Sequence, residues 1–208
     1  MSGGRFIALE GIEGVGKSTQ VALLAERLRV LGKDPVVVRE PGGTPFAEEV
    51  RQLLLHKPHD LTAASELFLF QAARADLVAR VIRPALEAGR IVLSDRFEMT
   101  SRTYQSAGRG LPLEQVQTAI ALATGGLAPD LYVVLDAPVD VGRSRQAAQG
   151  KGPDRLERES AAFHERAAAA YRAVNGPDVA HVASLDTAGA THEAVWRVVT
   201  QRFPELAR

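Results

Sequence analysis

Short apolar runs alternate along the chain with longer segments of helical periodicity. The short runs are rich in β-branched residues and apolar almost throughout, which is typical of parallel strands covered on both faces. Consecutive parallel strands need a crossover connection, and the helical segments between the runs are long enough to supply it. The pattern predicts five strands, at Phe6–Leu9, Val36–Arg39, Ile91–Ser94, Leu131–Leu135 and Val179–Val182.

Five other segments have the spacing or composition of helices. In the first, apolar residues recur at Val21, Leu24, Leu28 and Leu31, and Gly32 follows as a stop signal. The predicted helices are Lys17–Leu31, Thr62–Leu86 (ended by Pro84 and Gly89), Pro112–Ala123, Leu156–Asn175 and Thr191–Phe203. We therefore expect a three-layer α/β fold, in which helices flank a five-stranded parallel sheet.

The segment Gln146–Asp154 interrupts this alternation, because it has two glycines, a proline and little apolar content. It is either a plain connector or a mobile lid over a site. No linker, repeat or charge block divides the 208 residues, a length that suits one substantial core. We expect residues 1–208 to form a single domain.

Composition narrows the possible partners. Lys+Arg and Asp+Glu both number 25, so no net charge draws the chain to nucleic acid or to an anionic membrane. No apolar run approaches the roughly 20 residues that span a bilayer, and the absence of cysteine excludes disulfides and thiolate metal sites. We expect a soluble, unprocessed cytoplasmic protein whose phosphate chemistry, if any, rests on local clusters of charge.

The stretch GIEGVGKS, which begins at Gly11, has the pattern of a phosphate-binding loop (P-loop). Gly11, Gly14 and Gly16 allow the tight turn that aims backbone N–H groups at an anion. Lys17 supplies a charge to the outer phosphates, and the Ser18 hydroxyl can ligate Mg²⁺. The stretch follows a predicted strand and opens a predicted helix, which is the context that a P-loop requires. The sequence therefore predicts a nucleotide phosphate site here.

Further charged residues suggest a second anionic ligand. Asp95 ends a predicted strand, so its carboxylate is a candidate second metal ligand, and Arg96 follows it. Arg51 and Arg74 fall in other segments near the carboxyl ends of strands, as expected where a phosphoryl group passes between two anions. Phe70 lies one helical turn before Arg74, a spacing that a planar base could use, although a phenylalanine on a helix is more often part of the core.

Six motifs together resemble those of the bacterial thymidylate kinases, P-loop nucleoside monophosphate kinases. The resemblance runs in order and spacing from Phe6 to about Val199. The motifs are Leu9–Thr19 (LEGIEGVGKST), Arg39–Thr44 (REPGGT), Phe70–Arg74 (FQAAR), Asp95–Phe97 (DRF), Tyr104–Gln105 and Asp154–Glu157 (DRLE).

This resemblance implies ATP-dependent phosphorylation of dTMP to dTDP with Mg²⁺, in dTTP biosynthesis, by a homodimer. Ser18 and Asp95 would hold the metal. The implied ATP-binding residues are Gly11, Ile12, Glu13, Gly14, Val15, Gly16, Lys17, Ser18, Thr19 and Arg143.

The resemblance also implies a site for dTMP. Phe70 would stack on thymine, Arg74 would bond its O4 atom, and Ser101 with Gln105 would address its N3 edge. Tyr104 would lie under the deoxyribose, where it would disfavour a 2′-hydroxyl. Arg51 and Arg96 would grip the phosphate, and Glu40-Pro41 would form a cis turn beside them.

Glu13 resembles the P-loop residue of those family members that draw catalytic arginines from the lid, here about residues 143–155. Ala147 and Gln149 stand where related lids often carry arginine. Our hypothesis is that Arg145 and Arg155 neutralise the transferring phosphoryl group, supported by Arg143 or Lys151. The implied catalytic set is Lys17, Arg96, Arg145, Arg155 and Glu13. Arg102 is unexpected at its position, and the sequence offers no physical reason for it.

Two other classes of function compete with this interpretation. Another nucleoside monophosphate kinase, or a deoxynucleoside kinase, could share the Asp95-Arg96-aromatic arrangement. A P-loop molecular switch would bind GTP without transferring a group, but the Asn-Lys-x-Asp motif typical of such switches is missing from the chain.

Overall fold

The computed structural model describes residues 3–57, 60–147 and 152–208, and its centre is a five-stranded parallel sheet. The strands lie in the order β2-β3-β1-β4-β5. Each predicted strand is present, and each end differs from the prediction by at most one residue. The strands are β1 (Arg5–Glu10), β2 (Val36–Arg39), β3 (Ile91–Asp95), β4 (Leu131–Asp136) and β5 (Val179–Ala183).

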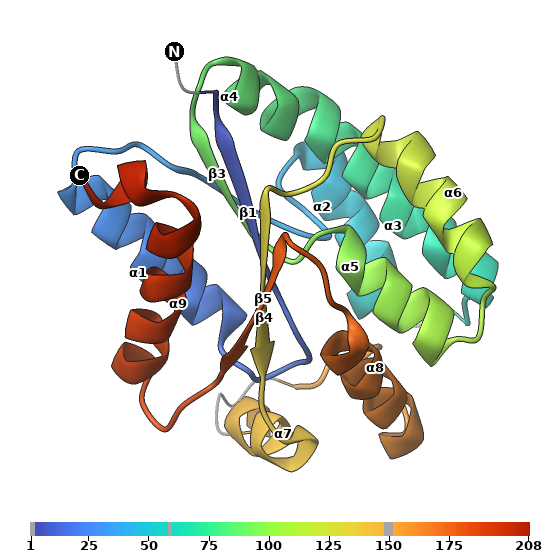
Figure 1. Cartoon of the computed structure of the whole chain (residues 1–208). Helices are drawn as coiled ribbons and strands as arrows, with labels where there is room; N and C mark the ends of the chain where they lie inside the picture. The colour runs from blue at the N-terminus through green and yellow to red at the C-terminus, as the bar shows by residue number, and fades with distance from the viewer. Residues whose placement is uncertain (1–2, 58–59, 148–151) are drawn as a thin grey trace.

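Helices cover both faces of this sheet (Figure 1), as the alternating pattern predicts. α1 and α9 lie on one face, and α3, α5 and α6 lie on the other, while α7 lies beyond the carboxyl end of β4. The helical segments are α1 (Lys17–Val30), α2 (Pro45–Arg51), η1 (Gln52–His56), α3 (Ala63–Leu77), η2 (Val78–Ile82), α4 (Arg83–Glu87), α5 (Glu98–Ser101), η3 (Arg102–Gly108), α6 (Leu113–Thr124), α7 (Val139–Ala147), α8 (Ala161–Ala173), α9 (Ala188–Arg202) and η4 (Pro204–Ala207).

The second predicted helix, Thr62–Leu86, is confirmed to within one residue at each end, but Pro84 lies inside its last turns and does not stop it. Helical turns continue from Ala63 to Glu87, and Gly89, with φ 74°, follows the end. In an α-helix the proline ring clashes with the carbonyl four residues earlier. Here that carbonyl belongs to Arg80, which lies within the wider π-helical turn η2, so the ring is accommodated.

The start of the predicted helix Leu156–Asn175 is wrong by five residues. Turns occupy residues 155–158, and α8 begins at Ala161 because the Ser160 side chain caps it by accepting a hydrogen bond from the Phe163 N–H. α2 was missed, although Thr44 caps it in the same way and Pro45 occupies its first turn, a usual start signal.

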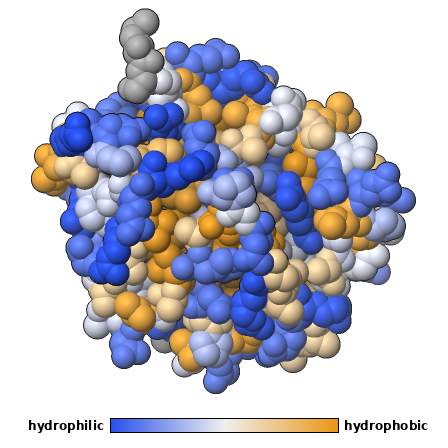
Figure 2. Space-filling view, viewed as in Figure 1, coloured by the Kyte–Doolittle hydropathy of each residue, from blue (hydrophilic) through white to orange (hydrophobic). Residues whose placement is uncertain are grey.

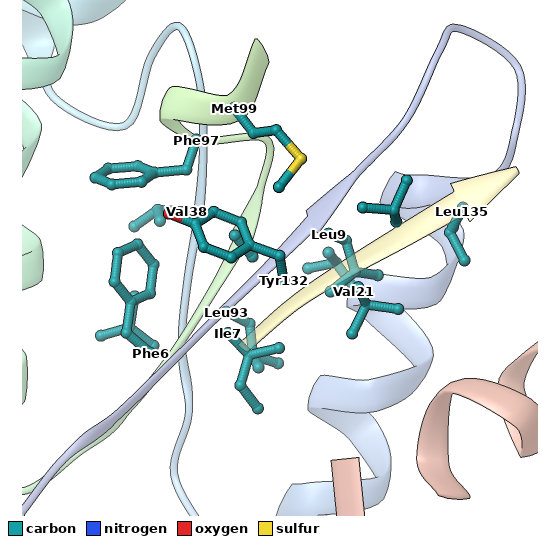
Figure 3. Close-up of a cluster of buried hydrophobic side chains, with 14 of the residues drawn as sticks. Phe6, Ile7, Leu9, Val21, Val38, Leu93, Phe97, Met99, Tyr132 and Leu135 are labelled. Atoms are coloured by element: carbon teal, nitrogen blue, oxygen red, sulfur yellow. The ribbon is translucent and has the colours of Figure 1, made fainter. Parts of the chain in front are cut away.

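Apolar side chains pack on both sides of the central strands (Figure 3). Phe6, Phe97 and Tyr132 gather on one side of β1, and Ile7 and Val21 lie on the other. The Phe6 and Phe97 rings meet edge to face, with centroids 4.9 Å apart, and burial of such a ring contributes about 1.5–3 kcal/mol. Because Phe97 follows Arg96 directly, this packing also anchors the loop that carries Arg96.

Among the described residues, every helix is too short or too polar to cross a bilayer. On the face shown in Figure 2, hydrophobic residues are interspersed among hydrophilic ones.

Candidate active site

The P-loop connects β1 to α1 and has the backbone that its glycines predict. Gly11, Gly14 and Gly16 all have positive φ, between 74° and 133°. At Gly14, a Cβ atom would come within 2.0 Å of the Gly142 carbonyl oxygen, so only glycine fits. α1 begins at Lys17, and its free N–H groups add positive potential at the loop. The loop is therefore shaped for an anion.

Lys17 is buried against this loop. Its Nζ atom donates to the carbonyl oxygens of Gly11 (3.0 Å) and Ile12 (2.6 Å). Burial and the nearby Arg96 guanidinium lower the pKa of Lys17 to about 8, although Asp95 opposes them. A phosphate at the loop would favour the charged ammonium again.

Ser18 and Asp95 lie together at the mouth of the loop. The Ser18 hydroxyl donates to Asp95 Oδ2, because the parallel pairing of β1 with β3 places Asp95 opposite Leu9. A hydroxyl and a carboxylate are hard oxygen donors of the kind that Mg²⁺ prefers beside substrate phosphates. Among the described residues no three His, Cys, Asp or Glu side chains form a metal cluster. This pair therefore fits Mg²⁺ held jointly by protein and nucleotide.

Arg96 lies between the loop and η3 in a left-handed backbone conformation, with φ 71°. Its guanidinium donates to the Gly11 carbonyl oxygen (3.0 Å) and to Glu13 Oε1 (2.8 Å), and stacks over the Tyr104 ring at 5.3 Å. Burial would lower the pKa of Arg96, but Tyr104 and Glu13 raise it well above its usual value. Arg96 therefore stays charged at the site.

Glu13 faces Arg96 from the P-loop. The Tyr104 hydroxyl donates to Glu13 Oε2 at 2.5 Å. Burial alone would raise the pKa of Glu13, but Arg96 and Lys17 outweigh it and lower that pKa. An ionised carboxylate therefore lies in the wall of the site, next to two cations.

A cavity of about 800 Å³ joins these residues to the side of the sheet that carries α3. The P-loop and Lys17 line one end, and Phe70 on α3 lines another part, with Arg51 and Arg96 also in the wall. Of the predicted site residues, those in the lining are Glu13, Gly14, Gly16, Lys17, Ser18, Thr19, Glu40, Pro41, Arg51, Phe70, Asp95, Arg96 and Tyr104.

The Glu40–Pro41 peptide is cis, as the resemblance implies. Arg51 Nη1 donates to the Pro41 carbonyl oxygen at 2.8 Å, so α2 and this turn hold each other beside the cavity. Arg39 lines the cavity too and pairs with Glu48 at 2.9 Å, so it adds a cation to the site beyond those predicted from the sequence.

Arg74 is buried one turn after Phe70, and each of its three guanidinium nitrogens donates a hydrogen bond within the protein. Nε and Nη2 contact Glu40 Oε2, and Nη2 also donates to the Phe97 carbonyl oxygen. Nη1 donates to Gln71 Oε1 and Ser101 Oγ. The structure thus brings Arg74 and Ser101 together, but in a buried polar cluster and not in the lining of the cavity.

Three predicted residues bond groups elsewhere in the protein. Arg145 donates to Ser184 Oγ (2.6 Å) and the Leu185 carbonyl oxygen (3.1 Å) after β5. Gln105 and Arg155 both donate to the buried Glu66 carboxylate on α3, at 2.9 and 2.6 Å.

The middle of the predicted lid, residues 148–151 with Gln149 and Lys151, lies outside the described residues. Arg143 is described, on α7, where it lines a small recess together with Ile12 and Glu13.

Glu10, at the end of β1, was missed. It is fully buried and accepts hydrogen bonds from the Phe97 N–H, the Thr100 hydroxyl and the Tyr171 hydroxyl. Burial raises the pKa of Glu10 to about 7, although Arg96 opposes the shift. A lone acidic residue at the end of an apolar strand was the available signal. Glu10 fixes the loop that presents Arg96.

Arg102, unexplained by the sequence, compensates a buried charge. Its Nε atom lies 2.8 Å from Glu98 Oε2, and Glu98 is buried on α5. The Tyr132 hydroxyl donates to the same carboxylate.

Comparisons with known proteins agree with this geometry. A sequence profile described as thymidylate kinase matches residues 9–196. The chain is 49% identical to a thymidylate kinase of Pseudomonas putida over 206 residues, 98% of this chain and 96% of the relative. It is 44% identical to one of Synechococcus sp. over 202 residues, 96% of each. The crystal structure of thymidylate kinase from Ehrlichia chaffeensis superposes with a TM-score of 0.78, at 29% identity, over 95% of this chain and 99% of that chain. The chain therefore belongs to the thymidylate kinase family.

Proposed function

We propose that the cavity holds ATP and dTMP end to end and that the γ-phosphate passes between them. As a thymidylate kinase, the protein phosphorylates dTMP to dTDP. The observation that carries the proposal is the single cavity, which has a P-loop at one end, an aromatic ring at another, and Arg51 and Arg96 in its wall. Two anions that repel one another need such cations to approach.

At the donor end, residues 11–19 bind the ATP phosphates through backbone N–H groups and Lys17. Lys17 exchanges its loop carbonyls for phosphate oxygens, which stabilise its charge. Ser18 and Asp95 hold Mg²⁺, which when bound neutralises charge on the phosphates. Arg143 and Arg145 on α7 lie on the lid side of ATP, and Arg145 must leave Ser184 to reach the transferring group.

At the acceptor end, Arg51 and Arg96 bind the dTMP phosphate, and Phe70 stacks on thymine. Glu40 and Pro41 shape the wall beside the nucleotide, and Tyr104, held by Glu13, packs under the deoxyribose.

Selection of thymine falls to the buried cluster next to Phe70. Because every guanidinium nitrogen of Arg74 already has a partner, a bond to thymine O4 must compete with these hydrogen bonds. Ser101 and Gln105 bind the N3 edge in competition with hydrogen bonds that they already make within the protein. A base without the O4 and N3 groups of thymine offers no hydrogen bonds in return for those that the protein gives up, so its binding is disfavoured.

An acceptor screen tests this function. With ATP and Mg²⁺ fixed, we expect kcat/KM for dTMP to exceed that for dCMP, AMP and thymidine by on the order of 10³-fold or more, because a site built to hydrogen-bond one base rejects others strongly. Formation of dTDP is followed by chromatography. Preference for dCMP or AMP would indicate another monophosphate kinase, and preference for thymidine a deoxynucleoside kinase; either would overturn the proposal.

We also propose a cytoplasmic homodimer in which residues 1–208 act as one domain, with a lid at about 143–155. α3 contacts both α2 and α6, and each carries an exposed apolar side chain: Phe68 (67% exposed), Phe46 (48%) and Leu122 (86%). Such a face favours association with a second copy. Sedimentation velocity should show a dimer that Phe68→Asp converts to monomer; a monomeric parent protein would refute this assembly.

A further inference from the structure

Glu66 joins three parts of the chain around one buried carboxylate. It lies on α3, one turn before Phe70, and its side chain is fully buried. Oε1 accepts from Gln105 Nε2 at 2.9 Å, and Oε2 accepts from Arg109 Nη2 at 2.9 Å and Arg155 Nη2 at 2.6 Å. The carboxylate thus links α3 to η3 and to the segment that carries Arg155.

This cluster keeps Glu66 charged. Burial alone would raise its pKa, but the hydrogen bonds from Arg109, Gln105 and Arg155 outweigh burial and lower that pKa. A buried carboxylate without partners is costly, so the arginines stay where Glu66 holds them. Arg109 also pairs with Glu159 at 2.6 Å. Without Arg155, Glu66 still keeps Arg109 and Gln105.

Arg155 is bound by more than its guanidinium tip. Its Nε donates to the Leu54 carbonyl oxygen at 2.7 Å, and its backbone N–H donates to the Leu55 carbonyl oxygen at 3.1 Å. Its neighbours Asp154 and Leu156 line the substrate cavity, whereas the Arg155 side chain turns to Glu66. The pair therefore sets the position of two cavity-lining residues.

We propose that Glu66 is a positioning residue for phosphoryl transfer, acting through Arg155: the pair fixes the cavity-lining segment 154–156 against the helix that stacks on the acceptor base. Filling the base site at Phe70 then favours the position of this segment in which the cavity also accepts ATP. This inference rests on the proposed function. It assigns Arg155 to coupling of the two substrates in place of the neutralising role suggested by the sequence.

The two roles of Arg155 predict different kinetics. An arginine that neutralises the transition state lowers kcat by on the order of 10³-fold when removed, with little change in KM. Loss of a positioning arginine should weaken ATP binding most where dTMP is already bound. It should raise KM for ATP roughly 5- to 20-fold, the usual size of coupling between two sites, with kcat within about tenfold.

A double-mutant cycle separates them, using Arg155→Met, Glu66→Gln and the double variant. We expect the double variant to resemble Arg155→Met, because the Glu66–Arg155 ion pair is already lost in that single variant. Arg155→Lys, which keeps a cation in reach of Glu66, should recover part of the ATP affinity. Arg158→Met is the matched control: Arg158 is exposed, and its Nε donates to the Pro153 carbonyl oxygen in the same segment.

Calorimetry provides a readout that does not depend on Glu66→Gln folding. A non-hydrolysable ATP analogue is titrated with and without dTMP. We expect dTMP to tighten the analogue in wild type and Arg158→Met, and to have no effect in Arg155→Met, which still binds each ligand alone. A 10³-fold loss of kcat at unchanged KM, additive effects in the cycle, or equal affinities in wild type would each overturn the inference. Failure of wild type to phosphorylate dTMP would instead refute the proposed function.

Discussion

In the proposed function, Lys17 is the residue whose charge bears most directly on ATP binding, and its pKa predicts how activity depends on pH. The pKa is about 8 because burial and Arg96 disfavour the ammonium. Only the ammonium attracts phosphate, and kcat/KM reports the free enzyme. We therefore expect kcat/KM for ATP to fall as pH rises through about 8. Lys17→Arg, charged throughout, should show no fall there; a flat wild-type profile to pH 10 would contradict this assignment.

Arg102 gives a prediction about stability. Arg102→Ala leaves Glu98 buried without its cation, and we expect a loss of about 1–3 kcal/mol of unfolding free energy, less than for a fully buried pair because Arg102 is partly exposed. Urea denaturation measures it. Arg102→Lys should retain most of the stability, and adding Glu98→Gln to Arg102→Ala should restore part of it. An Arg102→Ala variant as stable as the parent would show that the pair contributes nothing.

At the scale of elements, α2 carries Arg51 to the cavity and depends on Thr44, the residue that caps its N-terminus. Thr44 Oγ1 accepts from the Ala47 N–H at 3.1 Å and donates to Asp76 Oδ2 at 2.6 Å. Thr44→Ala should cost about 1–2 kcal/mol in urea unfolding and raise KM for dTMP, because Arg51 moves with the helix. Thr44→Ser keeps the hydroxyl and should behave as wild type. Loss of stability without a change in KM would separate the cap from the site.

The strands could be predicted almost to the residue because both faces of each are buried, which leaves a continuous apolar run. The helices were less predictable at their ends. The π-helical turn that lets the chain pass Pro84 has no local sequence signal, and α8 starts where Ser160 caps it and not where helical composition begins. Tertiary packing and side-chain caps decide such ends.

Across the whole molecule, many of the residues that line the cavity could be predicted, but the partners of the buried arginines could not. Lys17, Asp95 and Phe70 belong to local motifs, so spacing and family resemblance identify them. The partners of Arg74 and Arg155, by contrast, are separated from them by 34 and 89 positions. No local pattern indicates that these two arginines bind Glu40 and Glu66, so which cations face the substrates had to come from the fold.

The central claim is that both nucleotides occupy one continuous cavity with their phosphates meeting between Lys17 and Arg51. The most direct measurement is inhibition and calorimetry with a single molecule in which adenosine and thymidine are joined through their 5′ oxygens by a chain of phosphates. The account predicts one such molecule bound per chain, competitive with ATP and with dTMP, and tighter than either substrate because one association replaces two. Competition with only one substrate, or two molecules bound per chain, would contradict it.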